Sequence, residues 1–104
     1  MTERAAKRNA AKRNAAKRNA AYLEKLYCAL AKISDPRDIE QLLIDLCTTT
    51  EVDEIAKRLA VAQMLDDGFS YTEIQKETGA SAATIARVSR FLSEGAGGYR
   101  KVLQ

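Results

Sequence analysis

Residues 70–92 carry side chains that form hydrogen bonds and ion pairs, spaced as on two short helices. The six side chains of this set are Thr72, Gln75, Ser81, Thr84, Arg87 and Arg90. Hydroxyl and amide groups bond to phosphate oxygens and to base edges, and guanidinium groups pair with phosphates. The chemistry that this set predicts is recognition of a nucleic acid.

The composition does not favour catalysis or a zinc site. The chain has no His, which is the commonest general base, and no Cys-x-x-Cys pair. Its two cysteines, Cys28 and Cys47, lie within apolar helical patterns, so we expect reduced core thiols. We therefore predict no catalytic residues, no metal site and no cofactor.

The elements that must position these side chains are two capped helices around a glycine turn. Ser70 with Glu73 forms a capping box, and Ile74 lies on the buried side of the helix that follows. Gly79 suits the left-handed backbone of a sharp turn, and Ser81 caps the second helix. The apolar face of that second helix holds Ile85, Val88 and Leu92. This is the pattern of a helix-turn-helix that enters the major groove.

The outward side of the second helix is dominated by small residues. If Ile85 and Val88 point inward, Ala82, Ala83 and Ala86 point outward. Alanines form no hydrogen bonds with bases, so we expect specificity to rest on DNA shape and on water-mediated contacts. The DNA-contact candidates are Thr72, Gln75, Ser81, Ala82, Ala83, Thr84, Ala86, Arg87 and Arg90.

The positive charge of the chain is concentrated at its N-terminus. Residues 1–21 hold seven basic side chains and one acidic, a net charge of +6, whereas the other 83 residues hold ten basic and thirteen acidic. Residues 5–19 are three consecutive copies of AAKRN. We expect a frayed helix or a disordered arm. Its function is either to neutralise phosphates without reading sequence, or none, as a tolerated terminal repeat.

The remainder of the chain has helical periodicity and no strand pattern. Three amphipathic helices are predicted, and the apolar face of the first comprises Leu23, Leu26, Tyr27, Leu30 and Ile33. The second helix starts at Asp35-Pro36, and its apolar face comprises Ile39, Leu42, Leu43, Leu46 and Cys47. The third helix is capped by Thr48, Thr49 or Thr50, and its apolar face comprises Val52, Ile55, Leu59, Ala62 and Leu65. A last helical turn is expected over 99–103. The sequence predicts an all-α fold of about six helices, with an arm over 1–21 and a helix-turn-helix domain over 22–104.

Three stretches of the domain resemble one known family. EIAKRLAVAQMLDDGFSYTEI (54–74), ETGASAATIARVSRFL (77–92) and GAGGYRKVL (95–103) resemble the Trp-repressor superfamily, most closely its Trp-repressor-related YerC/YecD-type branch. The resemblance implies an intertwined, all-helical homodimer in which the first three helices of each subunit interlock. It also implies a transcriptional regulator, a repressor, that binds a two-fold DNA operator.

The same resemblance implies a corepressor pocket framed by Thr48, Arg58, Thr84 and Arg87. Two positions depart from the Trp-repressor pattern, because Val88 replaces a glycine and Phe91 replaces a serine that helps to hold the ligand. These bulkier groups disfavour tryptophan or another amino acid as corepressor. As an alternative to a pocket, Arg58 and Arg87 contact phosphates or pair with Glu51 or Asp66.

The sequence thus predicts a bacterial, sequence-specific DNA-binding transcriptional regulator that acts as a homodimer. It is not expected to be an enzyme or to associate with a membrane, since no apolar run approaches ~18 residues. We expect a cytoplasmic, nucleoid-associated protein. Two alternatives remain open: a helical protein-interaction module, and the DNA-binding part of a transposase-like system.

Overall fold

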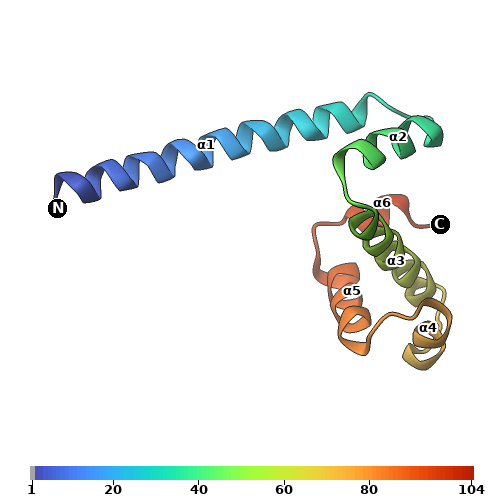
Figure 1. Ribbon diagram of the computed structural model, residues 1–104. Coiled ribbons are helices and arrows are strands. Elements are labelled where there is room, and N and C mark those ends of the chain that lie inside the picture. Colours follow the sequence, from blue (N-terminus) through green and yellow to red (C-terminus); the bar gives the residue numbers. More distant parts are fainter. Residues whose placement is uncertain (1) are drawn as a thin grey trace. The chain divides into compact units, whose positions relative to one another are not determined.

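The computed structural model describes residues 2–104, and over that range the chain is all-helical without a strand (Figure 1). Its six helices are α1 (Glu3–Ala31), α2 (Pro36–Leu46), α3 (Thr49–Asp66), α4 (Tyr71–Thr78), α5 (Ala82–Glu94) and α6 (Gly98–Val102). The predicted fold class and number of helices are confirmed. The contacts divide the chain into two units, of which the first ends at Asp45 and the second begins at Leu46. Each unit is described by itself.

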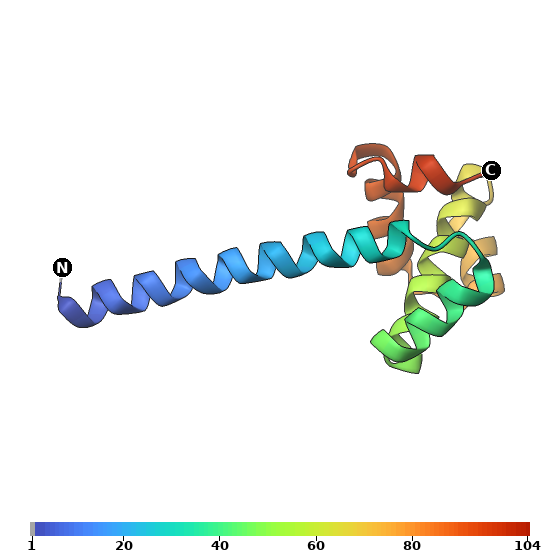
Figure 2. The same ribbon diagram turned by 90° about the horizontal axis from the view of Figure 1, so that it is seen from above.

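The first unit begins with the AAKRN repeats, which form a helix. Helix α1 continues without a break through the repeats and beyond them (Figure 2). The hydroxyl of Thr2 caps it by accepting a hydrogen bond from the N–H of Ala5 at 3.1 Å. The sequence predicted either a frayed helix or a disordered arm, and the structure has a helix. The division of the domains between residues 21 and 22 falls within this helix and stays a prediction.

Helix α2 starts as the sequence predicts. The carboxylate of Asp35 accepts a hydrogen bond from the N–H of Arg37 at 2.9 Å, and Pro36 takes the first helical position. Neither α1 nor α2 contains a buried residue. Large apolar side chains, including Tyr27, Ile44 and Leu46, stay exposed. No other part of the described chain covers the apolar faces of these two amphipathic helices.

Helix α3 begins with a capping box formed by Thr48 and Glu51. The N–H of Glu51 donates to Oγ1 of Thr48 at 3.1 Å, and the N–H of Thr48 donates to Oε1 of Glu51 at 2.8 Å. Of the three candidate threonines, Thr48 is thus the cap. The hydrogen bond from the Thr48 N–H, followed by that from its side chain, lowers the pKa of Glu51 below its ordinary value of 4.5.

This lowered pKa predicts a pH-dependent contribution to stability. A carboxyl whose pKa is lower in the folded state stabilises the fold fully above its unfolded-state pKa, and the contribution is lost as the pH falls through the folded value. Glu51→Gln keeps a hydrogen-bonding group but no charge. The wild type should therefore exceed Glu51→Gln in unfolding free energy at neutral pH, and the difference should shrink as the pH falls below 4.5. Urea unfolding of both proteins measures this, and a gap that persists at low pH contradicts it.

The core of the second unit lies where α3, α4 and α5 pack together (Figure 1). It consists of Val61, Ala62, Ile74, Ala80, Ile85 and Val88, with Met64, Leu65, Tyr99 and Leu103 packed against it. The predicted inward positions Ile74, Ile85 and Val88 are confirmed, and Leu92 is half-buried. The predicted apolar face of α3 packs only in part within the chain. Only the second half of α3 reaches the core, so Ile55 and Leu59 are 48% and 44% exposed.

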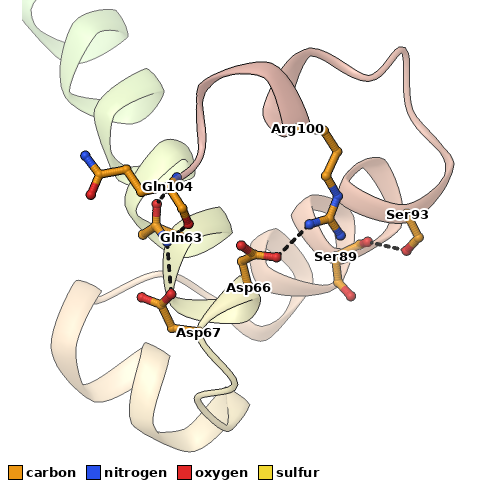
Figure 3. Close-up of polar contacts among 7 residues, drawn as sticks. All are labelled: Gln63, Asp66, Asp67, Ser89, Ser93, Arg100 and Gln104. Carbon is orange, nitrogen blue, oxygen red and sulfur yellow. Dashed lines mark hydrogen bonds and ion pairs between the residues drawn. The ribbon is translucent and has the colours of Figure 1, made fainter.

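The Gly-Gly-Tyr-Arg segment returns to α3 and holds the end of the chain there (Figure 3). Nη1 of Arg100 donates to Oδ1 of Asp66 at 2.6 Å. The N–H of Gln104 donates to Oε1 of Gln63 at 3.2 Å, and Nε2 of Gln63 donates back to the Gln104 carbonyl at 3.5 Å. The tail thus links α6 to the helix that supports α4 and α5.

Both cysteines are free, as expected. The expectation that both lie in the core is wrong for Cys28, which is exposed and donates to Oε1 of Glu24 at 3.8 Å. No helix of the described chain is both long and apolar enough to cross a membrane. Within residues 2–104, no three His, Cys, Asp or Glu side chains gather in a metal-binding arrangement.

Candidate nucleic-acid interface

The turn between α4 and α5 has the geometry of a helix-turn-helix. The hydroxyl of Ser70 accepts from the N–H of Glu73 at 3.2 Å, and Oε2 of Glu73 accepts from the N–H of Ser70 at 2.8 Å. Helix α4 ends at Gly79, whose φ of +74° is a left-handed conformation. A Cβ at Gly79 would meet no atom within 4 Å, so the backbone angle and not crowding selects glycine here. The predicted capping box and glycine turn are confirmed.

The turn is held to both helices by short hydrogen bonds. The Thr78 hydroxyl donates to the carbonyl of Ile74 at 2.7 Å and accepts from the N–H of Ala80 at 3.1 Å. The hydroxyl of Ser81 caps α5 by accepting from the N–H of Thr84 at 3.1 Å, and it donates to Oγ1 of Thr84 at 3.0 Å. These bonds and the buried Ala80 fix how α5 leaves the turn.

The outer face of α5 is exposed and free of bulky groups apart from two arginines. At about 100° per residue, Ala83, Ala86 and Arg90 lie on the side of the helix opposite Ile85 and Val88. A hollow on this face is lined by Ala83, Ala86, Arg87 and Arg90. Among the predicted contact residues, all but the half-buried Thr84 are exposed. The structure thus places Ala83, Ala86, Arg87 and Arg90 on one accessible face of α5. Thr72 and Gln75 are exposed on α4.

Both arginines of this face lie over the ring of Phe91. The Cζ atoms of Arg87 and Arg90 are 4.9 Å and 5.1 Å from the ring centroid. A guanidinium within about 6 Å of an aromatic ring is attracted by the negative face of the ring. Sequence reasoning treated Phe91 as a group that fills a ligand pocket and missed this contact. The i, i+4 spacing of Arg87 and Phe91 is the signal that indicates it.

Three of the four predicted pocket residues line two different hollows, and the predicted pocket stays a prediction. Thr48 and Arg58 line one hollow at the start of α3, whereas Arg87 lines the hollow on α5. The hydroxyl of Thr84 is bonded to Ser81. The predicted ion-pair partner Asp66 is bound instead by Arg100, and the ion pairs found among residues 2–104 include neither Arg58 nor Arg87.

An apolar groove opens on the second unit beside this face. It is lined by Ile55, Leu59, Phe91, Ala96, Gly98, Tyr99 and Val102, from α3, α5, α6 and the loop between the last two. Several of these side chains are large and exposed, including Ile55, Leu59 and Val102. Exposed apolar surface of this kind is typical of a protein–protein interface. Sequence periodicity placed Ile55 and Leu59 on an apolar face but did not predict the groove, which helices from several parts of the chain form together.

Comparison with known proteins identifies relatives over the same residues. The family model described as Trp repressor protein matches residues 21–104. The uncharacterized protein YerC of Bacillus subtilis strain 168 is 41% identical over 81 residues, which cover 78% of this chain and 78% of that protein. The family match begins beyond the last AAKRN copy, so the repeats lie outside it.

Two solved structures are also similar. A crystal structure of a proposed Trp repressor from Staphylococcus aureus superposes with a TM-score of 0.75 at 38% identity, covering 79% of this chain and 82% of that one. A TrpR-like protein from Eubacterium eligens gives a TM-score of 0.76 at 36% identity, with coverages of 79% and 84%. Sequence family and fold therefore agree.

Proposed function

Because this chain belongs to the Trp repressor family, we propose that it is a sequence-specific DNA-binding transcriptional regulator, acting as a homodimer on a two-fold operator. The observation that carries the proposal is the open face of α5 on a capped helix-turn-helix, with Arg87 and Arg90 at its side. A major groove about 12 Å wide admits such a helix.

The contacts divide into two kinds in this proposal. Arg87, Arg90 and the positive N-terminal end of α5 at Ser81 bind phosphates and fix the position of the protein on the duplex. Ala82, Ala83 and Ala86 let the helix come close to the bases, where they meet thymine methyl groups or ordered water. Thr72 and Gln75 on α4, together with Thr84, supply the remaining hydrogen bonds.

The homodimer accounts for the apolar surface that one chain leaves open. Helices α1 and α2 bury no residue, and the groove beside Leu59 and Phe91 is uncovered. We propose a second copy of the chain as the partner that covers the groove, since each copy offers amphipathic helices without a core of their own. A two-fold dimer also presents two α5 helices to successive turns of DNA, about 34–36 Å apart.

We further propose that the regulator works without a tryptophan corepressor. Val88 is 1% exposed and belongs to the core, so it is Phe91 that disfavours a ligand. Phe91 lies under two guanidinium groups, where an indole ring would compete for the same arginines. The protein would then be a non-enzymatic regulator that works in the cytoplasm, on the nucleoid.

Binding to genomic DNA tests the function. Fragments recovered by pull-down with the full chain are titrated by fluorescence anisotropy in about 150 mM salt. A specific fragment should bind at least about 1,000-fold more tightly than random duplex of equal length, the lower end of what specific regulators achieve. Binding that is equally weak for every fragment and lost at this salt concentration overturns the proposal. Calorimetry with tryptophan should show no heat of binding, and a saturable signal overturns the corepressor-free form.

A further inference from the structure

The N-terminal part of α1 is a dense and uniform patch of positive charge. Residues 4–23 contain seven Lys and Arg side chains and no carboxylate. One ion pair involves this part of the helix, between Lys7 Nζ and Oε1 of Glu3 at 3.7 Å, and both side chains are almost fully exposed. An exposed pair of this kind contributes little. The positive charge of the arm is therefore available to a partner.

The five-residue repeat distributes this charge around the helix. Each AAKRN copy rotates its Lys-Arg pair by about 140° relative to the previous copy, so three copies place cations on every side. The repeat also brings like charges to i, i+4 spacing at Arg4–Arg8, Arg8–Lys12 and Arg13–Lys17. Such pairs destabilise a helix. A polyanion that surrounds the helix would relieve this repulsion.

The chemistry of the arm distinguishes among polyanionic partners. A membrane surface requires an apolar face, and between its cations the arm offers only alanine and asparagine. The major groove of duplex DNA has phosphates along both walls and a width of about 12 Å, close to the 10–12 Å diameter of a helix with its side chains. The major groove of double-stranded RNA is too narrow to admit it.

We propose that residues 3–20 of α1 form a second DNA-binding element that lies along the major groove and binds phosphates on both sides without reading sequence. This inference rests on the proposed function, because a tethered cationic helix is useful to a chain that already binds DNA. It adds affinity and salt dependence to that binding, and leaves the choice of sequence to α5.

The first test compares salt dependence. The full chain and a variant with Gln at six positions (K7Q, R8Q, K12Q, R13Q, K17Q and R18Q) are titrated with a random 40-base-pair duplex at several KCl concentrations. Glutamine keeps the helix propensity and removes the charge. The plot of log K against log salt should become shallower by about 5 per protomer, from 0.9 per phosphate released. The control N14Q/N19Q should match the wild type. An unchanged slope in the six-site variant overturns the proposal.

The second test asks whether the arm lies in the groove as a helix. Guanine N7 atoms of the same duplex should be protected from dimethyl sulfate by the wild type and less by the six-site variant. A10P/A15P keeps every charge but breaks the helix, so it should retain most of the salt slope and lose the extra protection. Equal protection with A10P/A15P, or equal affinity for double-stranded RNA, overturns the groove-bound helix.

These outcomes separate the two proposals. A wild type that prefers no genomic fragment but keeps the arm-dependent slope refutes the regulator and supports the arm. If the wild type selects its fragment, but its plot of log K against log salt has the same slope as that of the six-site variant, the proposed role of the arm is refuted and the regulator is supported.

Discussion

Replacing Ala86 by Glu should weaken binding of the specific fragment by at least about 100-fold while the protein stays folded. Ala86 is exposed on the outer face of α5, within the hollow that Arg87 and Arg90 border. A glutamate there removes the close approach to the groove and brings a carboxylate toward phosphates. Loss of a single contact costs about 1–3 kcal/mol, and a homodimer carries the change twice. Anisotropy titration measures the affinity, and circular dichroism with sedimentation checks the fold and the dimer.

The matched control is Ala86→Gln, which has the same size without the charge. It should weaken binding less than Ala86→Glu, and the difference between the two variants should shrink as salt rises, because screening reduces repulsion between the carboxylate and phosphates. If Ala86→Glu binds the fragment as tightly as the wild type, α5 does not enter the groove. The proposed interface would then be wrong even if the protein binds DNA elsewhere.

Replacing Leu59 by Asp should convert the proposed homodimer to a monomer at micromolar concentration. Leu59 is 44% exposed in the single chain and lies in the apolar groove, outside the core. Burying an unpaired carboxylate at an interface costs several kcal/mol, beyond the apolar contact that is lost. Because a two-fold interface contains the substitution twice, the dissociation constant should rise by more than about 1,000-fold. Sedimentation velocity between 1 and 100 µM measures this.

Leu59→Met, a volume-conserving change, should remain dimeric and serves as the control. A Leu59→Asp protein that sediments as a dimer at 1 µM shows that the groove is not the interface between copies. Circular dichroism distinguishes a folded monomer, which supports the interface, from an unfolded chain, which would show instead that Leu59 contributes to the fold of the subunit. The same variant should lose specific DNA binding, because one α5 helix reaches only half of a two-fold site.

Local signals were sufficient to predict the helix-turn-helix. The pairing of Ser70 with Glu73, the glycine at position 79 and the cap at Ser81 each have a short-range physical cause, and each is confirmed. The inward positions of α5 follow from a periodicity of 3.6 residues. The all-α class follows equally, since no segment alternates as a strand does.

Properties that depend on distant partners were not predictable in this way. Ile55 and Leu59 have the spacing of a core face, and periodicity cannot tell whether such a face meets its own chain or another one. The four proposed pocket residues came from a family pattern, and within one chain Arg58 and Arg87 line different hollows. The spacing of polar residues indicates which side of a helix they share, whereas a pocket depends on how helices from several places meet.

The ring of Phe91 lies below two guanidinium groups at once, within 4.9 Å and 5.1 Å of them. In the proposed interface Arg87 and Arg90 are therefore coupled, because both guanidinium groups contact the ring of Phe91. Their substitutions should not be additive, as is general for residues in mutual contact. In the proposed interface, one substitution at position 91 would therefore change two phosphate contacts together and alter the affinity for DNA, whereas the choice of sequence stays with the other residues of α5.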